Sequence, residues 1–159
     1  MKIYTIGYEG SNFDEWFQIL IEHQITCVVD IREIPVSRKR GFSKTKLRDA
    51  LECAGIKYVH YRSLGSPSDI RKQLHRDGDY ITFFEKFDAY LDEQQDELEE
   101  IVGLAQSERI CLLCFEQNHR RCHRHSVAQR LSSLMPKGAE IVNVDCGKRL
   151  AQNINLNYG

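Results

Sequence analysis

The residue types best suited to chemistry are concentrated in one stretch, which reads ICLLCFEQNHRRCHRHSVAQRL from Ile110 to Leu131. Thiols and imidazoles act as nucleophiles, bases or metal ligands, carboxylates transfer protons, and guanidinium groups bind anions. The apolar start predicts a strand buried on both faces, the polar middle predicts a loop, and helical spacing predicts a helix from Cys122 or His123 onward. Open α/β sheets bind ligands at such loops. The candidate residues there are Cys114, Glu116, Arg120, Arg121, Cys122, His123 and Arg124.

Short apolar strands alternate with amphipathic helices along the whole chain. We expect strands at residues 2–8, 25–31, 56–61, 110–115 and 140–145. Asn12 and Ser43 are each expected to cap a helix. Residues 64–79 should form an irregular loop with a possible short helix, and residues 80–105 one long helix or two in series. This alternation predicts a single Rossmann-like three-layer α/β domain over residues 1–150, with a mostly parallel five-stranded sheet. Residues 151–159 are expected to form a loose tail.

Length, charge and cysteine usage narrow the class of protein. At 159 residues the chain is long enough for one domain with its own core, and its net charge of −1 favours neither nucleic acid nor membrane as a general partner. We find no apolar segment of signal-peptide or membrane-spanning length, so we expect a cytoplasmic protein without a membrane partner. Six cysteines in a reducing compartment are expected to be free thiols, without a disulfide.

Two loops at the predicted carboxyl edge of the sheet are cationic. The segment from Arg32 to Arg48 has seven basic residues against the single acid Glu33, and three arginines cluster at 120–124 without an acid between them. Such loops favour an anionic ligand, most commonly phosphate, although solvated surface charge is the alternative. The candidate anion-binding residues are Arg32, Arg38, Arg120, Arg124 and Tyr8.

Two carboxylates, Asp30 and Glu116, end or follow buried strands of this sheet. A buried carboxylate is costly to desolvate unless it meets a cation or keeps water. Arg32 or Arg124 can supply that cation, which would make a structural ion pair. The alternative is an acid or base that faces a ligand held by arginine.

The cysteines allow three interpretations. Cys111 and Cys114 have C-x-x-C spacing, but a strand places them on opposite faces, which argues against a redox or metal-binding pair. Cys114 and Arg120 match the C-x(5)-R spacing of cysteine phosphatases, but the loop between them lacks small residues and contains a carboxylate that repels phosphate. Cys114, Cys122 and His123 are potential zinc ligands, with Cys146 or His119 as a fourth.

A set of short motifs is spread along most of the chain: Thr5–Tyr8, Val29–Arg32, Pro35, Ser37, Arg38, Ala54–His60, Leu64, Gly65, Cys111–Glu116 and Cys122–Arg124. In these motifs the sequence resembles the DUF488 family of domains of unknown function. The resemblance covers nearly the whole chain up to about Val144 and implies an α/β fold with its motif residues gathered at one edge. It implies no particular reaction, substrate or cofactor.

These observations favour an enzyme that acts on a phosphate-bearing ligand, such as a nucleotide, a modified base or a nucleic-acid end. Arg32, Arg38 and Arg124 would bind the anion, Glu116 or Asp30 would transfer protons, and Cys114 and His123 would shape the site. The alternatives are a non-catalytic nucleotide- or nucleic-acid-binding domain and a zinc-stabilised interaction module. The leading hypothesis includes no cofactor or metal.

The predicted topology leads to two further expectations about the loop before the Cys122 helix. Because both segments leave the carboxyl edge of one parallel sheet, Asp30 and Arg32 should lie close to the Cys122–Arg124 turn. The N-terminus of the helix near Cys122 should bind phosphate or sulfate, because its backbone N–H groups are unpaired and arginines surround it.

Overall fold

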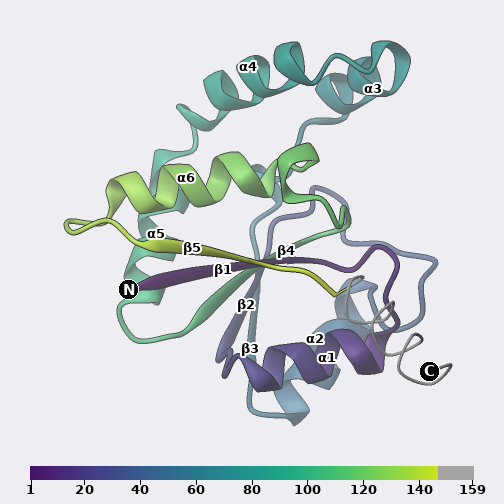
Figure 1. Cartoon of the computed structure of the whole chain (residues 1–159), viewed down its shortest axis with the longest axis vertical. Coiled ribbons are helices and arrows are strands. Elements are labelled where there is room, and N and C mark those ends of the chain that lie inside the picture. The colour runs from purple at the N-terminus through teal and green to yellow at the C-terminus, as the bar shows by residue number, and fades with distance from the viewer. Residues whose placement is uncertain (147–159) are drawn as a thin grey trace, which may run out of the picture.

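Five parallel strands form the centre of the protein in the computed structural model, which describes residues 1–146 (Figure 1). The strands are β1 (Lys2–Gly7), β2 (Cys27–Asp30), β3 (Lys57–His60), β4 (Ile110–Cys114) and β5 (Glu140–Val144), in the order β3-β2-β4-β1-β5. Each neighbouring pair is parallel, which confirms the predicted α/β fold class. The predicted tail lies outside the described residues.

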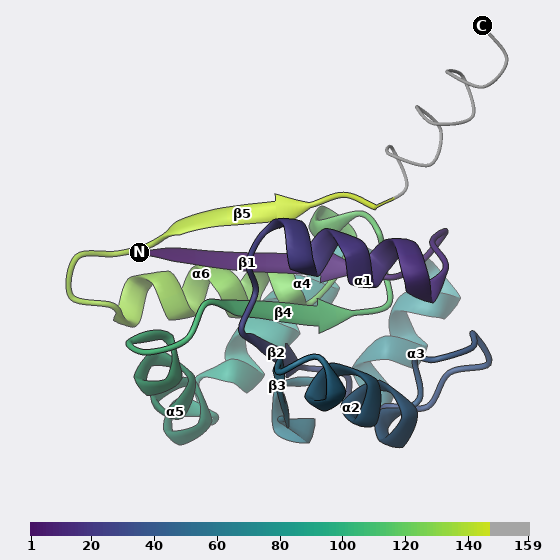
Figure 2. The same cartoon turned by 90° about the horizontal axis from the view of Figure 1, so that it is seen from below.

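Helices cover both faces of this sheet and complete a three-layer arrangement (Figure 2). One face is covered by α1 (Phe13–Glu22) and α2 (Lys44–Cys53), and the other by α4 (Tyr80–Leu91), α5 (Gln95–Ala105) and α6 (Arg124–Leu134). Helix α3 (Ser68–Asp77) packs beside α4, and 3-10 turns lie at Arg62–Leu64 and His119–Arg121. No helix in the described range 1–146 has both the length and the apolar character needed to span a membrane.

The position of strand β4 explains why its sequence is apolar on both faces and does not alternate with polar residues. Ile110 and Leu112 pack in the core beneath α4, α5 and α6, whereas Cys111 and Leu113 pack in the core beneath α1 and α2. All five β4 residues are buried, since the strand lies between β2 and β1 and is covered on both faces. A central strand covered on both faces carries the first candidate residue, Cys114, at its carboxyl end.

The segment from 64 to 79 is more regular than expected, because it contains the ten-residue helix α3. None of the α3 residues is fully buried, so the apolar stripe that normally reveals a helix is reduced to the half-buried pair Ile70 and Leu74. The helix ends at Gly78, which adopts the left-handed conformation. Further along, residues 92–94 separate α4 from α5, so the region 80–105 forms two helices in series.

Gly7 ends β1 where the loop after β4 crosses it. A Cβ atom at this position would lie 1.9 Å from the carbonyl oxygen of Glu116 and 2.9 Å from Nη1 of Arg124. Tyr8 and Glu9 donate their backbone N–H groups to the carbonyl oxygen of Phe115, which holds the two chain segments together. The loop that carries Glu116 therefore requires glycine beneath it.

We predict that Gly7→Ala lowers the free energy of unfolding by about 1–3 kcal/mol, because the added methyl group overlaps backbone atoms that cannot move aside. Gly103→Ala is the control, since Gly103 lies on the exposed side of α5 with no atom near its would-be Cβ. Alanine there should stabilise the helix by up to about 1 kcal/mol. Denaturant unfolding of both variants and the wild type gives the measurement. A Gly7→Ala variant as stable as wild type would contradict the close packing.

Candidate functional site

A pocket of about 420 Å³ opens at the carboxyl ends of β1, β2 and β4. Its walls come from the loops that follow these strands, together with the start of α3 and His123 before α6. The lining residues are Tyr8, Arg32, Glu33, Ile34, Val36, Ser37, Arg38, Ser66, Arg71, Cys114, Phe115, Glu116 and His123. The pocket thus contains most of the sequence-predicted candidates, with Arg71 and Ser66 as additions.

Arg71 reaches this pocket because the chain before α3 packs tightly on the loop after β2. A Cβ atom on Gly65 would lie 2.1 Å from the backbone nitrogen of Glu33, so only glycine allows this approach. Arg71 then donates to the carbonyl oxygen of Ser66 at 2.6 Å and lies 3.6 Å from the carboxylate of Glu33. The sequence did not point to Arg71, because glycine and proline in 64–79 predict a mostly irregular loop; the helical spacing of Ile70 and Leu74 was the available signal.

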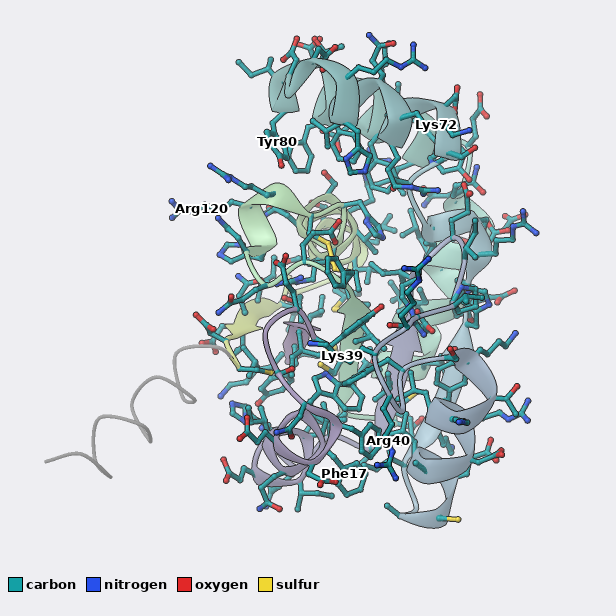
Figure 3. The ribbon with its side chains drawn as sticks, turned by 90° about the vertical axis from the view of Figure 1, so that its right-hand side faces the viewer. Phe17, Lys39, Arg40, Lys72, Tyr80 and Arg120 are labelled. Carbon is teal, nitrogen blue, oxygen red and sulfur yellow. A yellow bond between two sulfur atoms is a disulfide. The ribbon has the colours of Figure 1, made fainter. Side chains whose placement is uncertain are left out.

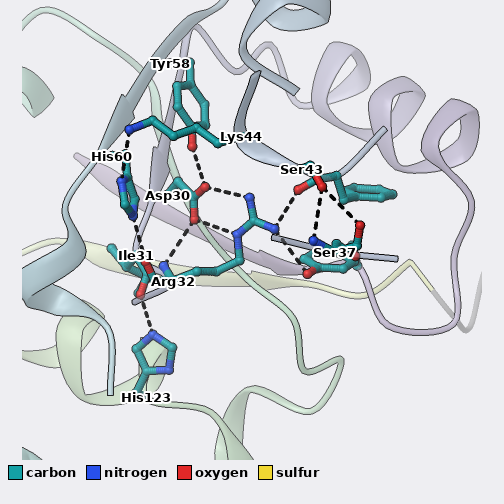
Figure 4. A network of polar contacts seen from close by, with 11 residues as sticks. Asp30, Ile31, Arg32, Ser37, Ser43, Lys44, Tyr58, His60 and His123 are labelled. Carbon is teal, nitrogen blue, oxygen red and sulfur yellow. Dashed lines mark hydrogen bonds and ion pairs between the residues drawn. The ribbon is translucent and has the colours of Figure 1, made fainter. Parts of the chain in front are cut away.

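Asp30 and Arg32 form a buried ion pair beside the pocket (Figure 4). The guanidinium of Arg32 donates from Nε to Oδ1 of Asp30 at 2.9 Å and from Nη2 to Oδ2 at 2.8 Å. Its Nη1 donates to the carbonyl oxygen of Phe42 and to the hydroxyl of Tyr8, while Tyr58 donates to Asp30 at 2.5 Å. Burial lowers the pKa of Arg32, but the contacts with Asp30 outweigh that effect and raise it above its usual value.

This network favours the structural interpretation of Asp30 and Arg32. Asp30 is fully buried and Arg32 is 6% exposed, and most of the Arg32 donors are occupied by protein acceptors. Tyr8 stacks on Phe42 with 4.3 Å between ring centroids, so the ring forms a fixed wall of the pocket. The assignment of Asp30 to catalysis, and of Arg32 and Tyr8 to anion binding, stays a prediction. It has less support than the assignment of residues whose polar atoms are free.

Arg124 is buried to 1% exposure although it carries a charge. Its side chain turns back under the sheet edge, where Nε donates to the hydroxyl of Thr5 at 3.2 Å and Nη2 to the carbonyl oxygen of Gln117 at 2.9 Å. Nη1 donates to the sulfur of Cys114 at 3.0 Å and to the carbonyl oxygen of Glu116. Burial lowers the pKa of Arg124 to about 10, against the opposing effect of the Glu116 carboxylate, so the guanidinium stays charged at neutral pH.

The sulfur atoms of Cys114 and Cys122 are joined in a disulfide, drawn as a yellow bond in Figure 3. The expectation of six free thiols is therefore wrong. Strand alternation correctly separates Cys111 from Cys114, since Cys111 packs in the core beneath α1 and α2. The expectation failed because the loop after β4 folds back and brings Cys122, eight residues further on, against the end of the strand.

His123 connects this turn to the end of β2. Its Nε2 lies 2.7 Å from the carbonyl oxygen of Ile31, so Nε2 carries the proton, and its Nδ1 lies 3.8 Å from the sulfur of Cys122. Burial lowers the pKa of His123 and so favours the neutral ring, while the Glu116 carboxylate opposes this effect. The expected closeness to the Cys122–Arg124 turn is confirmed for Arg32, which follows Ile31 and lines the same pocket as His123. Asp30 does not line that pocket, and its carboxylate binds Arg32 and Tyr58 instead.

The arginines before α6 do not converge on one point. Arg121 lies over the ring of Tyr80 at 5.6 Å, and Arg120 points away from the protein surface (Figure 3). Arg120 and Arg124 line a second pocket of about 530 Å³ that also contains Glu9 and Asp145. The first-turn N–H of Arg124 approaches the sulfur of Cys122 at 3.5 Å. Phosphate binding at this helix N-terminus stays a prediction, although the geometry offers it fewer free donors than the sequence suggested.

Comparison with known proteins assigns the chain to a family. The family described as "Domain of unknown function DUF488" matches residues 12–131. The chain belongs to the DUF488 family. No curated protein and no solved structure matches this chain. The DUF488 description names no activity, so the chemistry of the pocket follows from its geometry alone.

We predict that Asp30→Asn lowers the free energy of unfolding by about 3–5 kcal/mol, because it leaves the buried guanidinium of Arg32 without its counter-charge. The control is Asp49→Asn, which breaks the Arg48–Asp49 pair, whose side chains are 43% and 63% exposed. Exposed pairs contribute only about 0–1 kcal/mol. Denaturant midpoints measured at neutral pH compare the two, and a loss of less than about 1 kcal/mol at Asp30 would contradict a structural role.

Proposed function

We propose that this DUF488 protein is an enzyme that acts on a phosphate-bearing small molecule bound in the pocket at the carboxyl edge of the sheet. The observation that carries the proposal is the lining of that pocket. It combines partly exposed guanidinium groups, at Arg38 and Arg71, with the disulfide-bonded sulfur of Cys114 and the carboxylate of Glu116. Small-molecule sites have this form, with an apolar wall and a few convergent polar groups.

Arg38 and Arg71 are better suited to anion binding than the buried arginines. Arg38 is exposed and forms no hydrogen bond or ion pair with other residues in the range 1–146. Arg71 is held at the pocket wall by Ser66 and only loosely by Glu33, whose carboxylate is 3.6 Å away. A charged group that is held in place loses little freedom when it binds a ligand. Arg38 therefore offers charge that the fold itself does not use, and Arg71 offers charge that Glu33 only partly neutralises.

Glu116 is the acid–base group with the clearest access to a ligand. It is half-buried, it lines the pocket, and no hydrogen bond of its side-chain carboxylate is found within the described residues, unlike that of Asp30. Its backbone carbonyl is fixed by Arg124, so the position of the residue is set independently of its carboxylate. A carboxylate placed this way can take or give a proton during reaction at a phosphate-bearing ligand.

We expect Arg71→Ala to weaken phosphate binding, since removal of one charge-assisted contact costs about 1.5–3 kcal/mol, or roughly 10–150-fold in affinity. Arg40→Ala is the matched control, because Arg40 belongs to the same basic loop as Arg38 but lines a different pocket. Thermal unfolding is followed with inorganic phosphate, pyrophosphate, nucleoside 5′-phosphates and a 5′-phosphorylated oligonucleotide. If no probe raises the Tm of wild type, or if both variants respond like wild type, the pocket is not the phosphate site.

We expect Glu116→Gln to keep or strengthen binding of the same probes, because the change removes a negative charge that repels phosphate. Turnover of the bound probes, followed by chromatography of the nucleotides, should fall by about 10²–10⁴-fold if Glu116 transfers a proton. Bound probe without turnover in the wild type would support the alternative, a non-catalytic nucleotide- or nucleic-acid-binding domain, and would reject catalysis on that probe.

A further inference from the structure

Two cysteine sulfur atoms and one carboxylate meet at the floor of the pocket. The sulfur atoms of Cys114 and Cys122 and one carboxylate oxygen of Glu116 lie within 4.8 Å of one another. They come from three places in the chain, namely the end of β4, the loop after it and the turn before α6. The fold therefore gathers three potential metal ligands where Cys114 and Glu116 also line the pocket.

We propose that this group binds one Zn²⁺ ion when Cys114 and Cys122 are reduced, with Glu116 as the third ligand and a fourth position directed to the pocket. The proposal does not depend on phosphate as the pocket's ligand. It differs from the hypothesis favoured by the sequence, which included no metal. It also differs from the zinc alternative considered there, because Glu116 replaces His123 as a ligand.

The ligand set is one that zinc accepts. Zn²⁺ binds thiolate sulfur at about 2.3 Å and carboxylate oxygen at about 2.0–2.2 Å, and three protein ligands with one open position are typical of catalytic sites. Two thiolates in a tetrahedral site lie roughly 3.8 Å apart by this geometry. The Cα atoms of Cys114 and Cys122 are 7.6 Å apart, wider than the range of about 4.4–6.8 Å that most disulfides span. This backbone spacing leaves room for an ion between the two side chains once they are reduced.

The charges around the group also favour a divalent cation. Two thiolates and one carboxylate carry a charge of −3, which Zn²⁺ and the guanidinium of Arg124 together neutralise. Arg124 donates to the sulfur of Cys114 at 3.0 Å, and its backbone N–H lies 3.5 Å from the sulfur of Cys122. Hydrogen bonds of this kind to metal-bound thiolates orient the ligands and stabilise their charge.

The imidazole of His123 is placed to support this site rather than to complete it. Its Nε2 is already bonded to the carbonyl oxygen of Ile31, and its ring packs edge-on against Phe87. Those contacts hold the neighbouring Cys122 in place. The four remaining cysteines are less suitable ligands, since Cys27, Cys111 and Cys146 are buried apart from the group and Cys53 is an exposed helical residue.

Binding requires that the disulfide is first opened by a reductant, such as a small thiol or a phosphine. Two equivalents of a small thiol reduce the Cys114–Cys122 bond to two thiols and leave as one disulfide of the reductant. Zn²⁺ then displaces the two thiol protons to the solvent and binds the two thiolates. Diamide reverses this step: it takes two electrons from the two thiolates and becomes the hydrazine, the sulfurs are joined again and the ion is released. The oxidised protein is therefore a control that has the same sequence.

The test measures zinc per chain directly. Wild type is reduced with a phosphine under nitrogen, equilibrated with Zn²⁺ in phosphate-free buffer, dialysed, and analysed for metal. We expect one Zn²⁺ per chain in the reduced protein, none in protein oxidised with diamide, and none in Cys114→Ser or Cys122→Ser. Glu116→Gln should weaken zinc binding by about tenfold or more. Co²⁺ in place of Zn²⁺ should give a thiolate-to-cobalt charge-transfer band that the two cysteine variants lack.

Cys53→Ser is the matched control, because Cys53 is the exposed free cysteine of the described chain. It should bind one Zn²⁺ like wild type, and far-ultraviolet circular dichroism should show that every variant is folded. The proposal is overturned if the reduced wild type binds no zinc, if Cys114→Ser binds as much as wild type, or if Cys53→Ser is the variant that loses the metal. Because no phosphate ligand is present, none of these results depends on the proposed function.

Discussion

The carboxyl edge of this sheet depends on one buried guanidinium group, that of Arg124. Its donors reach Thr5 in β1, the sulfur of Cys114 in β4 and two carbonyl oxygens in the loop that follows β4. A buried charge is costly unless its donors are satisfied, and each of these acceptors offsets part of that cost. The same contacts fix the loop that carries Glu116 and bring Cys122 to Cys114. The inward-folded Arg124 therefore links the segments that form the floor of the pocket.

A second buried guanidinium, that of Arg32, stabilises the opposite wall in a different way. Arg32 meets a full counter-charge in Asp30, whereas Arg124 meets mostly neutral acceptors and the more distant Glu116 carboxylate. The electrostatic contrast appears in the direction of their pKa values, which is raised for Arg32 and lowered for Arg124. One arginine of each basic segment, Arg32 or Arg124, is thus buried and bonded within the fold. The charge left for a ligand lies at Arg38 and Arg71.

The two proposals concern different parts of one pocket. The proposed anion contacts lie on its wall, at Arg38 and Arg71, while the proposed zinc ligands lie on its floor. If both hold, an ion with an open position would face a phosphate-bearing ligand held by arginine, and metal ions act on such ligands by stabilising negative charge. If Glu116 ligates zinc through one oxygen, its second oxygen remains available for proton transfer. The oxidised protein distinguishes the anion proposal from the zinc proposal, because it keeps both arginines and loses the two thiols that would bind zinc.

The sequence by itself determined the sheet and the edge at which the candidate residues gather. Continuous apolar runs such as Ile110–Phe115 mark strands covered on both faces, and their carboxyl ends collect at one edge whatever the details of packing. It also separated Cys111 from Cys114, because alternation of side chains along a strand is a local property. The capping of α1 by Asn12 followed from the same local rules.

Only the tertiary structure decided which charged groups are used internally and which face the pocket. Arg32, Arg38 and Arg124 look alike in sequence, but burial and partners differ because the loops fold back over the sheet edge by different amounts. Arg71 was missed because α3 buries no residue fully, and its approach depends on Gly65 lying against Glu33. The pairing of Cys114 with Cys122 depends on a loop conformation that is set by long-range contacts to Arg124. Such contacts between distant segments leave no periodic pattern in the sequence.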